Sequence, residues 1–551
     1  MSRWSTLGVG VGSSILLAFG SVYGCSDGAN TSVFDGGDDG TSGSADGGEG
    51  GGSGTAGFTA TGGNAGTAGS GGNAGTGGTS GGDACTPGLR CNVACPAGTT
   101  TTISGTVYDP AGKDPLYGVT VYVPAGPLQP LPRGLLPGSE ACSCAALYKS
   151  GALVSTTTDV NGHFTLKDAP VGADVQLVLQ VGKWRHVVTI PTVNQCADNP
   201  PSADQKFSLN GTVAAGSDDS LPDIAVSTGH SDTLECLLKR IGLPDTEYVA
   251  GTGTAGHIHV YSGGQPMGAI LSDQTNPGVA ELNPMPGAPA SDTNLWDSVS
   301  HLTPYDILLL SCEGGETYDA KPAALEQYLN EGGRAFASHY HYGWFAGSLV
   351  SGQGYSAPTA WGSNLATWET NPGEELGPDN GVVVQSLNGG AGSFPKGVFL
   401  SQWLANVDAL GAFGVPASDL AIWYPRYNAV VSSTNPASQP WITTTPEPDS
   451  GVTGTQTMYF SFDTPIGGIP SPEGGAPNYC GRAVFSDLHV SGAPTVNDTP
   501  NLFGDAGAPP PGGCVMQDLS PQEKALEFML FDLASCVVAD DVNPPTSAPV
   551  N

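Results

Sequence analysis

A long run of glycine and small polar residues near the amino terminus limits what this chain can fold into. Across residues 36–82 almost every residue is Gly, Ser, Thr, Ala, Asn or Asp, and the motif at 62–66 recurs at 71–75. Such a segment has almost no apolar surface to offset the entropy lost on ordering. We therefore expect residues 36–82 to be a flexible tether with a reach of roughly 40 Å. It belongs to a tether region at 25–98 that ends in a cluster of cysteines, and folded structure is expected to begin after it.

Residues 1–24 have the pattern of a secretion signal. Arg3 supplies a short positive region, and the apolar run at 7–19 is too short and too rich in glycine to span a bilayer. Val22 and Gly24 precede Cys25, which resembles the bacterial lipoprotein signal. The resemblance implies cleavage after residue 24 and acylation of Cys25, so the expected partner is the lipid bilayer. We predict a lipid-anchored protein of the bacterial cell envelope, with an ordinary secreted protein as the alternative.

Charge excludes one large class of partners. The 551 residues include 51 acidic and 17 basic side chains, for a formal net charge of -34. The longest cluster of basic residues is the pair Lys239 and Arg240. Because nucleic acids are bound mainly by neutralising their phosphates, we expect no nucleic-acid partner.

The cysteines indicate an oxidising compartment. The chain has twelve, and eleven remain when Cys25 is set aside, so at least one thiol must stay outside intramolecular disulfides. Two groups lie close together in sequence, namely Cys85, Cys91 and Cys95, and Cys142 with Cys144. Neither group has a C-x-x-C pair or histidines at matching spacing, so disulfides are favoured over a metal site.

Residues 99–210 are predicted to form a small β-sandwich. Residues 101–108 alternate with a period of two before a turn at 109–112, and a second strand is expected at 118–124. Asn161 and Gly162 are typical of a hairpin turn. At least five short strands of this kind fit a sandwich better than an open sheet.

The order of motifs in this region resembles the carboxypeptidase regulatory-like domain. The segments that carry the resemblance are 105–109, 116–121, 158–166 and 170–172. The family's glycines and aspartate mark turns. The resemblance therefore implies a prealbumin-like fold without catalytic residues.

Residues 220–540 are predicted to form a doubly wound parallel sheet with helices. Short apolar strands at 223–229, 257–261, 305–311 and 334–338 alternate with helical patterns. A capping box at Ser520 and Glu523 begins the last helix. The tail at 541–551 is expected to be loose.

Three segments of this region resemble the class I glutamine amidotransferase-like fold, nearest to its trehalose-utilisation-like branch. They are 305–315, 325–339 and 481–489. The resemblance implies an oxyanion loop at Gly314 and Gly315, and a partner histidine at His489.

The chain departs from this family at the positions that carry its chemistry. The strand-to-helix turn that should hold a cysteine nucleophile has Ser338 and His339, and the glutamate expected two residues after His489 is Ser491. Cys312 belongs to the loop, and we expect its thiol to point away from His339 as a buried thiol or a disulfide. Glutaminase activity is therefore not expected, and a protein that binds an envelope ligand or partner is favoured over an enzyme.

The expected ligand crevice lies at the carboxyl ends of these strands. Its residues are Cys312, Gly314, Gly315, His339, His341, Asp487 and His489. An alternative is a hydrolase of a carbohydrate or a cell-wall amide, whose candidate catalytic residues are His489, His339 and Glu313. No cofactor is expected. A divalent metal is a second possibility, with the candidate ligands His339, His341, Asp487 and His489.

The anchor can be tested directly. In a bacterial host, Cys25→Ala should release the protein from the membrane or block its maturation, because the thiol that carries the lipid is gone. Metabolic labelling with a palmitate analogue measures this. Equal labelling of wild type and Cys25→Ala would contradict the lipoprotein assignment.

Overall fold

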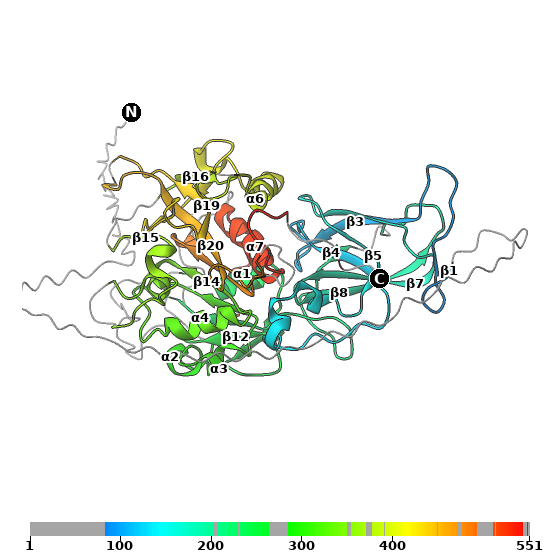
Figure 1. Cartoon of the computed structure of the whole chain (residues 1–551), viewed down its shortest axis with the longest axis horizontal. Coiled ribbons are helices and arrows are strands. Elements are labelled where there is room, and N and C mark those ends of the chain that lie inside the picture. The colour runs from blue at the N-terminus through cyan, green and yellow to red at the C-terminus, as the bar shows by residue number, and fades with distance from the viewer. Residues whose placement is uncertain are drawn as a thin grey trace, which may run out of the picture. The chain divides into compact units, whose positions relative to one another are not determined.

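A computed structural model gives the architecture of the chain (Figure 1). The predicted signal, Cys25 and the glycine-rich tether up to residue 82 lie outside the residues that it describes. None of the helices it describes is long and apolar enough to cross a bilayer. The described residues are 83–201, 206–229, 232–263, 285–349, 354–370, 377–390, 392–448, 450–470, 477–492, 511–512, 514–543 and 548.

The first part of the chain folds into two small sheets that pack face to face. Residues that alternate along the strands, such as Ile103 and Val107 in one sheet and Leu177 and Leu179 in the other, enter one buried cluster. The turn at Gly162 has a φ of 71°, but the strands at 152–157 and 163–167 on its two sides belong to different sheets, so the predicted hairpin is wrong. One sheet has the order β6 (His163–Lys167), β3 (Thr102–Tyr108), β9 (Phe207–Ser208), and the other β5 (Ala152–Thr157), β4 (Thr120–Pro124), β7 (Gly172–Val181), β8 (Trp184–Val193). A short ribbon, β1 (Asp83–Ala84) with β2 (Arg90–Cys91), precedes them.

The second part is built on a ten-stranded mixed sheet. Six neighbouring strands are parallel. In spatial order these six are β11 (Tyr248–Ala250), β12 (Ile258–Tyr261), β10 (Ile224–Ser227), β13 (Ile307–Leu310), β14 (Arg334–Ser338) and β21 (Gly481–Ser486). After β10 the chain adds two strands on one side of it, β11 and β12, and then crosses to add β13, β14 and β21 on the other side.

The remaining four strands correct the prediction of a parallel sheet. They are antiparallel and extend the sheet beyond β21. They belong to the long segment between β14 and β21, where no strand was predicted. The four are β20 (Gln456–Thr464), β19 (Ser438–Thr444), β16 (Asp379–Val383) and β17 (Leu420–Ile422), while β15 (Thr367–Trp368) and β18 (Ala429–Val430) pair separately.

Both faces of the parallel strands are buried by helices. In β13, Ile307 and Leu309 join one apolar cluster, whereas Leu308 and Leu310 join another. The first cluster includes residues of α1 (Leu234–Arg240), α6 (Pro395–Asn406) and α7 (Pro521–Ala534). The second includes residues of α3 (Val299–Leu302), α4 (Pro322–Asn330) and α5 (Tyr342–Ala346), and α2 (Ser291–Asn294) precedes α3.

The predicted capping box starts α7. The Ser520 hydroxyl accepts a hydrogen bond from the backbone of Glu523, and the Glu523 side chain accepts one from the backbone of Ser520. The helix packs between the sheet and the sandwich, where the rings of Trp184 and Phe531 lie 5.1 Å apart. Trp403 of α6 donates a hydrogen bond of 2.6 Å to the Pro115 carbonyl of the sandwich. The two parts therefore share one apolar core.

Disulfides join the two parts covalently. Cys142 pairs with Cys480, and Cys144 pairs with Cys536, across 338 and 392 residues. The other disulfides of the described residues are Cys85–Cys91, Cys95–Cys196 and Cys236–Cys514. The preference for disulfides over metal sites is confirmed, and among the described cysteines only Cys312 stays outside a disulfide.

Of the predicted tail at 541–551, the structure describes residues 541–543 and 548. Ala548 is buried, and its carbonyl accepts a hydrogen bond of 2.7 Å from the Ser155 hydroxyl. This residue joins a small apolar cluster with Tyr122 and Val178 of the sandwich.

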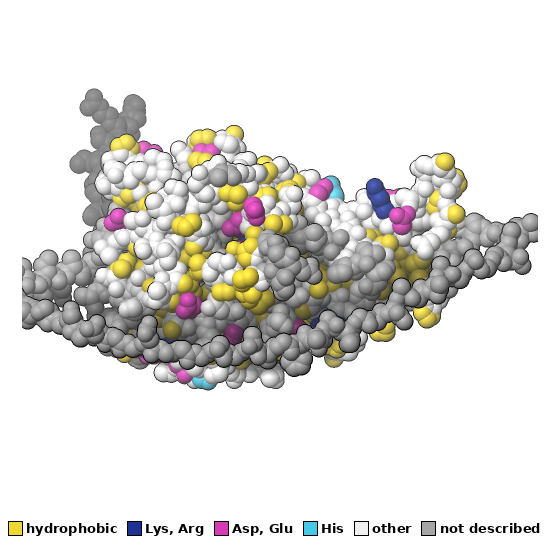
Figure 2. Space-filling view, viewed as in Figure 1, with side chains coloured by type: hydrophobic (Ala, Val, Ile, Leu, Met, Phe, Trp, Pro, Cys, Tyr) yellow, Lys and Arg dark blue, Asp and Glu magenta, His cyan; other side chains and the backbone are white. Residues whose placement is uncertain are grey.

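The face in Figure 2 carries few Lys and Arg side chains, as expected from a net charge of -34.

The long-range disulfides should dominate the effect of reductant on stability. Replacing both Cys144 and Cys536 by Ala should lower the free energy of unfolding by roughly 2–5 kcal/mol, because with Cys142–Cys480 intact the bond still closes a loop of roughly 60 residues in the unfolded chain. Replacing Cys85 and Cys91, only 6 residues apart, is the matched control and should cost less. Chemical denaturation measures both variants. An equal loss in the two would contradict this account.

Candidate functional site

The candidate site lies where four adjacent strands of the parallel half end. The residues that follow β10, β13, β14 and β21 include Gly229, Cys312, His339 and His489. Gly229 lets two of these ends approach closely, since a Cβ there would lie 2.4 Å from the Cys312 carbonyl oxygen. Ligands commonly bind at the carboxyl edge of such a sheet, next to the point where the chain switches from one side of its first strand to the other.

His339 occupies a sharp strand-to-helix turn. It directly follows β14, begins the short 3₁₀ turn His339–His341, and has a φ of 42°. Non-glycine residues seldom adopt this left-handed conformation, and such strain is concentrated at functional positions. The turn therefore has the geometry that a nucleophile elbow needs, with an imidazole in place of a thiol.

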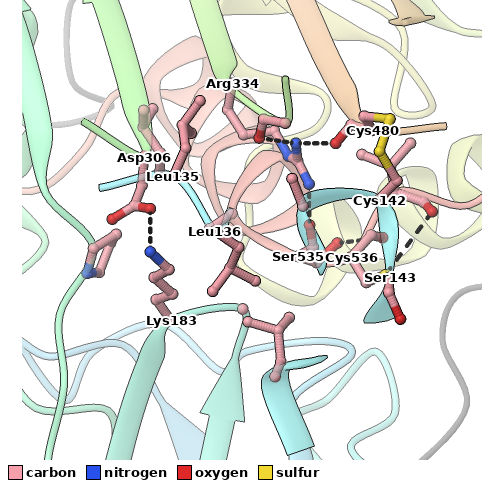
Figure 3. A pocket seen from close by; sticks show the side chains of 18 of the residues that line it. Leu135, Leu136, Cys142, Ser143, Lys183, Asp306, Arg334, Cys480, Ser535 and Cys536 are labelled. Carbon is pink, nitrogen blue, oxygen red and sulfur yellow. Dashed lines mark hydrogen bonds and ion pairs between the residues drawn. A yellow bond between two sulfur atoms is a disulfide. The ribbon is translucent and has the colours of Figure 1, made fainter. Parts of the chain in front are cut away.

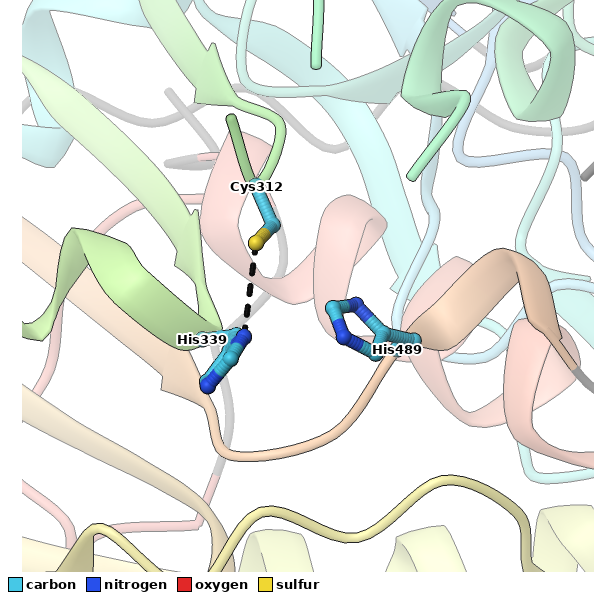
Figure 4. Close-up of side chains that lie close together, drawn as sticks. All are labelled: Cys312, His339 and His489. Atoms are coloured by element: carbon cyan, nitrogen blue, oxygen red, sulfur yellow. Dashed lines mark hydrogen bonds between the residues drawn. The ribbon is translucent and has the colours of Figure 1, made fainter. Parts of the chain in front are cut away.

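Cys312 points toward that turn. Its Sγ lies 3.4 Å from Nδ1 of His339, and the side chain is completely buried (Figure 4). The expectation that the thiol would point away from His339 is wrong. The reason is the backbone of Cys312, whose N–H donates a hydrogen bond of 2.9 Å to the Ser338 hydroxyl and so fixes the loop against the end of β14.

His489 completes the cluster from the loop after β21. Its ring centroid lies 4.9 Å from that of His339, with the ring planes at 87° (Figure 4). Nδ1 of His489 lies 3.5 Å from Oδ2 of Asp232, which is buried. Cys312, His339 and His489 each place one ligand atom within 4.8 Å of the other two, and we call them the Cys312 cluster.

Asp232 is the functional candidate that sequence reasoning missed. The family pattern places a carboxylate two residues after the histidine, where this chain has Ser491. Here Ser491 instead donates its backbone N–H to Oδ1 of Asp232 at 3.0 Å, and its hydroxyl accepts from the backbone of Thr233 at 2.9 Å. Asp232 is distant from His489 along the chain, so its contact with His489 has no sequence pattern. The one sequence feature that could have indicated Asp232 is an acidic residue in the loop between β10 and α1.

His341 lies outside the Cys312 cluster. Its Nε2–H donates to the Ser311 carbonyl at 2.8 Å, while Nδ1 faces the Thr317 hydroxyl at 2.6 Å and Trp344 Nε1 at 3.2 Å. Burial lowers the pKa of His341 to about 4. Both ring nitrogens are thus occupied by protein groups, which makes His341 a neutral structural residue.

Asp487 and Glu313 also lie apart from the cluster. Oδ2 of Asp487 accepts a hydrogen bond of 2.8 Å from the backbone of Ala429, and burial raises the pKa of this carboxyl to about 7. Glu313 is buried, and a Cβ built at Gly263 would lie 2.9 Å from its Oε1, which places the carboxylate near the loop after β12. The predicted set His339, His341, Asp487 and His489 therefore does not converge as a whole.

The two glycines of the predicted oxyanion loop differ in their roles. Gly314 has a φ of 82°, which favours glycine. Gly315 shows no such constraint, since a Cβ there would meet nothing within 4 Å among the described residues. The Cys312 N–H is held by Ser338, so this donor is not directed at a substrate oxygen.

A separate cavity of about 70 Å³ lies near the opposite edge of the sheet (Figure 3). Asp306 and Arg334 from the amino ends of β13 and β14 line it with Lys183 of the sandwich. Lys183 Nζ pairs with Asp306 at 2.7 Å, and Arg334 donates to the Cys480 carbonyl at 2.6 Å. These polar groups are paired within the protein, and they lie beside the two disulfides that join the sandwich to the second part. The cavity therefore belongs to the interface between these two parts.

Comparisons with known proteins add little. Neither protein-family models nor curated proteins match the chain. Among solved structures, a ThuA-like protein from Parabacteroides merdae has 12% identity over 59% of this chain and 94% of its own, with a TM-score of 0.24. A type II cohesin–X-dockerin complex from Acetivibrio cellulolyticus has 17% identity over 28% of this chain and 78% of its own, with a TM-score of 0.14. With TM-scores this low, neither likeness contributes to the assignment of function.

The environment of His341 gives a prediction about pH. Because burial lowers its pKa to about 4, the ring should stay neutral from pH 8 down to about 5 and charge only below that. Nuclear magnetic resonance of the ring protons as a function of pH measures this, with His341→Gln assigning the signal. A titration midpoint above pH 6 would show that the ring is solvated and open to ligands.

Proposed function

We propose that the protein is a bacterial envelope lipoprotein, acylated on Cys25, whose second domain binds a ligand at the Cys312 cluster. The five disulfides support an extracytoplasmic location, because such bonds persist in oxidising compartments. The tether would hold the folded part away from the membrane, with the sandwich as a carboxypeptidase regulatory-like module beside the binding domain.

The second domain is proposed to be a modified amidotransferase-like fold with a doubly wound parallel half. Its support is the strand order around β10 and the turn at His339, which matches the place of a nucleophile elbow. The antiparallel strands β16, β17, β19 and β20 would then be an extension inserted before β21.

The observation that carries the proposal is the imidazole of His339 at the elbow. An acyl-enzyme route needs a nucleophile at that turn, a base beside it and donors directed at the developing oxyanion. Here the thiol comes from the neighbouring strand end, and its Sγ lies 3.4 Å from Nδ1 of the imidazole. Its backbone donor is held by Ser338. A buried, closely spaced set of three donor side chains fits ligand binding better than glutamine hydrolysis.

Hydrolysis of a carbohydrate or a cell-wall amide remains the second candidate function. The observation that favours it is the pairing of His489 with Asp232, which resembles the histidine and carboxylate of a general-base pair. Turnover of such a substrate by the full chain that is lost in His489→Ala would support the hydrolase. Turnover that is unchanged in His489→Ala would dismiss this role for the pair.

Glutaminase activity gives the direct test. We expect no release of ammonia from glutamine above the protein-free background and no covalent labelling by a glutamine-analogue affinity reagent, because no thiol stands at the elbow. Mass spectrometry of the labelled protein and a Cys312→Ser control make the measurement specific. Stoichiometric labelling of Cys312 that is lost in Cys312→Ser would show that the domain is an enzyme and would reject the binding function.

A further inference from the structure

The Cys312 cluster combines one thiol and two imidazoles in a buried place. Cys312, His339 and His489 are each exposed by 3% or less, and their donor atoms lie within 4.8 Å of one another. Bonds of about 2.0–2.3 Å from a metal to nitrogen or sulfur put tetrahedral donors roughly 3.3–3.8 Å apart, so small side-chain movements bring these three donors to one ion. Three strand ends, after β13, β14 and β21, supply the three donors, so the scaffold beneath them is rigid.

We propose that Cys312, His339 and His489 bind one Zn²⁺ ion. The proposal rests on the proposed function, since it names the ligand of the same cluster. One thiolate and two neutral imidazoles form a ligand set that suits zinc, and three protein ligands leave a fourth tetrahedral position for water or a further ligand.

Among the residues that the structure describes, the group of close donor atoms at these strand ends contains no carboxylate, which sets the selectivity. Asp487 is engaged by the backbone of Ala429, and Glu313 is directed toward the loop after β12. A site without carboxylate ligands discriminates against Mg²⁺ and Ca²⁺, which require oxygen donors.

Asp232 acts as a positioning residue for the ion. With Oδ2 of Asp232 facing Nδ1 of His489 at 3.5 Å, a metal on Nε2 leaves Nδ1–H to donate to the carboxylate. Oδ1 of the same carboxylate is fixed by the backbone of Ser491 at 3.0 Å. Histidines that bind metals commonly donate their second ring N–H to a carboxylate in this way, which fixes the tautomer and the ring orientation.

Metal binding would replace the contact between Cys312 and His339. Sγ of Cys312 lies 3.4 Å from Nδ1 of His339, the distance of a sulfur hydrogen bond. On binding, the thiol proton leaves to solvent, the thiolate binds the metal, and the imidazole keeps its neutral form. Affinity should therefore rise with pH as proton release becomes easier.

The test uses the full chain, stripped of metal by a chelator at neutral pH and then titrated with Co²⁺ as a spectroscopic substitute for Zn²⁺. We expect one equivalent to bind, with an intense near-ultraviolet thiolate-to-cobalt charge-transfer band, and one equivalent of Zn²⁺ to remove the band. An excess of Mg²⁺ should leave it unchanged. The wild-type band alone tests thiolate ligation, so the result does not depend on any variant folding.

Variants then assign the ligands. Cys312→Ser should abolish the charge-transfer band, and Asp232→Asn should weaken Zn²⁺ binding by about 10–100-fold while the band persists. His301→Ala is the matched control, because His301 is exposed and lies outside the cluster. Circular dichroism establishes that each variant is folded.

Two outcomes would overturn the zinc site: a folded wild type that binds no Co²⁺ or Zn²⁺, or a charge-transfer band that survives in folded Cys312→Ser. Either of these, with no glutamine hydrolysis, rejects the zinc site and leaves the binding function standing. Glutamine hydrolysis with covalent labelling of Cys312 would instead reject the binding function.

Discussion

Burial of the parallel strands on both faces is the constraint on which the site depends. Alternate residues of β13 enter two different apolar clusters, so the strand has no place for a polar side chain along its length. For β13, polar chemistry therefore begins only where the strand ends. There Cys312, His339 and His489 leave three neighbouring strands within a few ångströms of one another. The same burial that stabilises the sheet thus concentrates the reactive groups at one edge.

The proposed binding domain would keep the turn of a nucleophile elbow and change the groups upon it. The strained turn carries His339, the thiol belongs to the neighbouring strand end at Cys312, and the carboxylate beside His489 comes from Asp232. The first two changes leave the turn without the thiol that acyl transfer needs there, whereas a carboxylate beside His489 is retained. Together these residues place one sulfur and two imidazoles, all buried, within 4.8 Å of one another, which favours an ion over a large substrate.

Much of the fold could be predicted from the sequence because local patterns dictate it. Strands β10, β13 and β14 contain short apolar runs, β12 has the single polar residue His259 among apolar ones, and the capping box of α7 is a local signal. The antiparallel strands could not be predicted in this way. Strand β19, for example, includes Gln439 and Pro440, and it lies inside the sheet because β16 and β20 pair on its two sides.

The candidate site was predicted less completely, for a physical reason. Its location at strand ends follows from topology, so His339 and His489 could be predicted from sequence. The direction of a side chain depends on tertiary contacts: Ser338 fixes Cys312 toward His339, and Ser311 with Thr317 holds His341 away. Asp232 meets His489 only in the folded chain, and no spacing in the sequence signals that contact.

X-ray absorption at the zinc edge tests the central claim most directly, because it measures the atoms around the ion. On protein loaded with one equivalent of Zn²⁺, the account predicts one sulfur neighbour at about 2.3 Å and two imidazole nitrogens at about 2.0–2.1 Å. A first shell of oxygen and nitrogen without sulfur would show that Cys312 is not a ligand. That result would contradict the assignment of the Cys312 cluster as a zinc site.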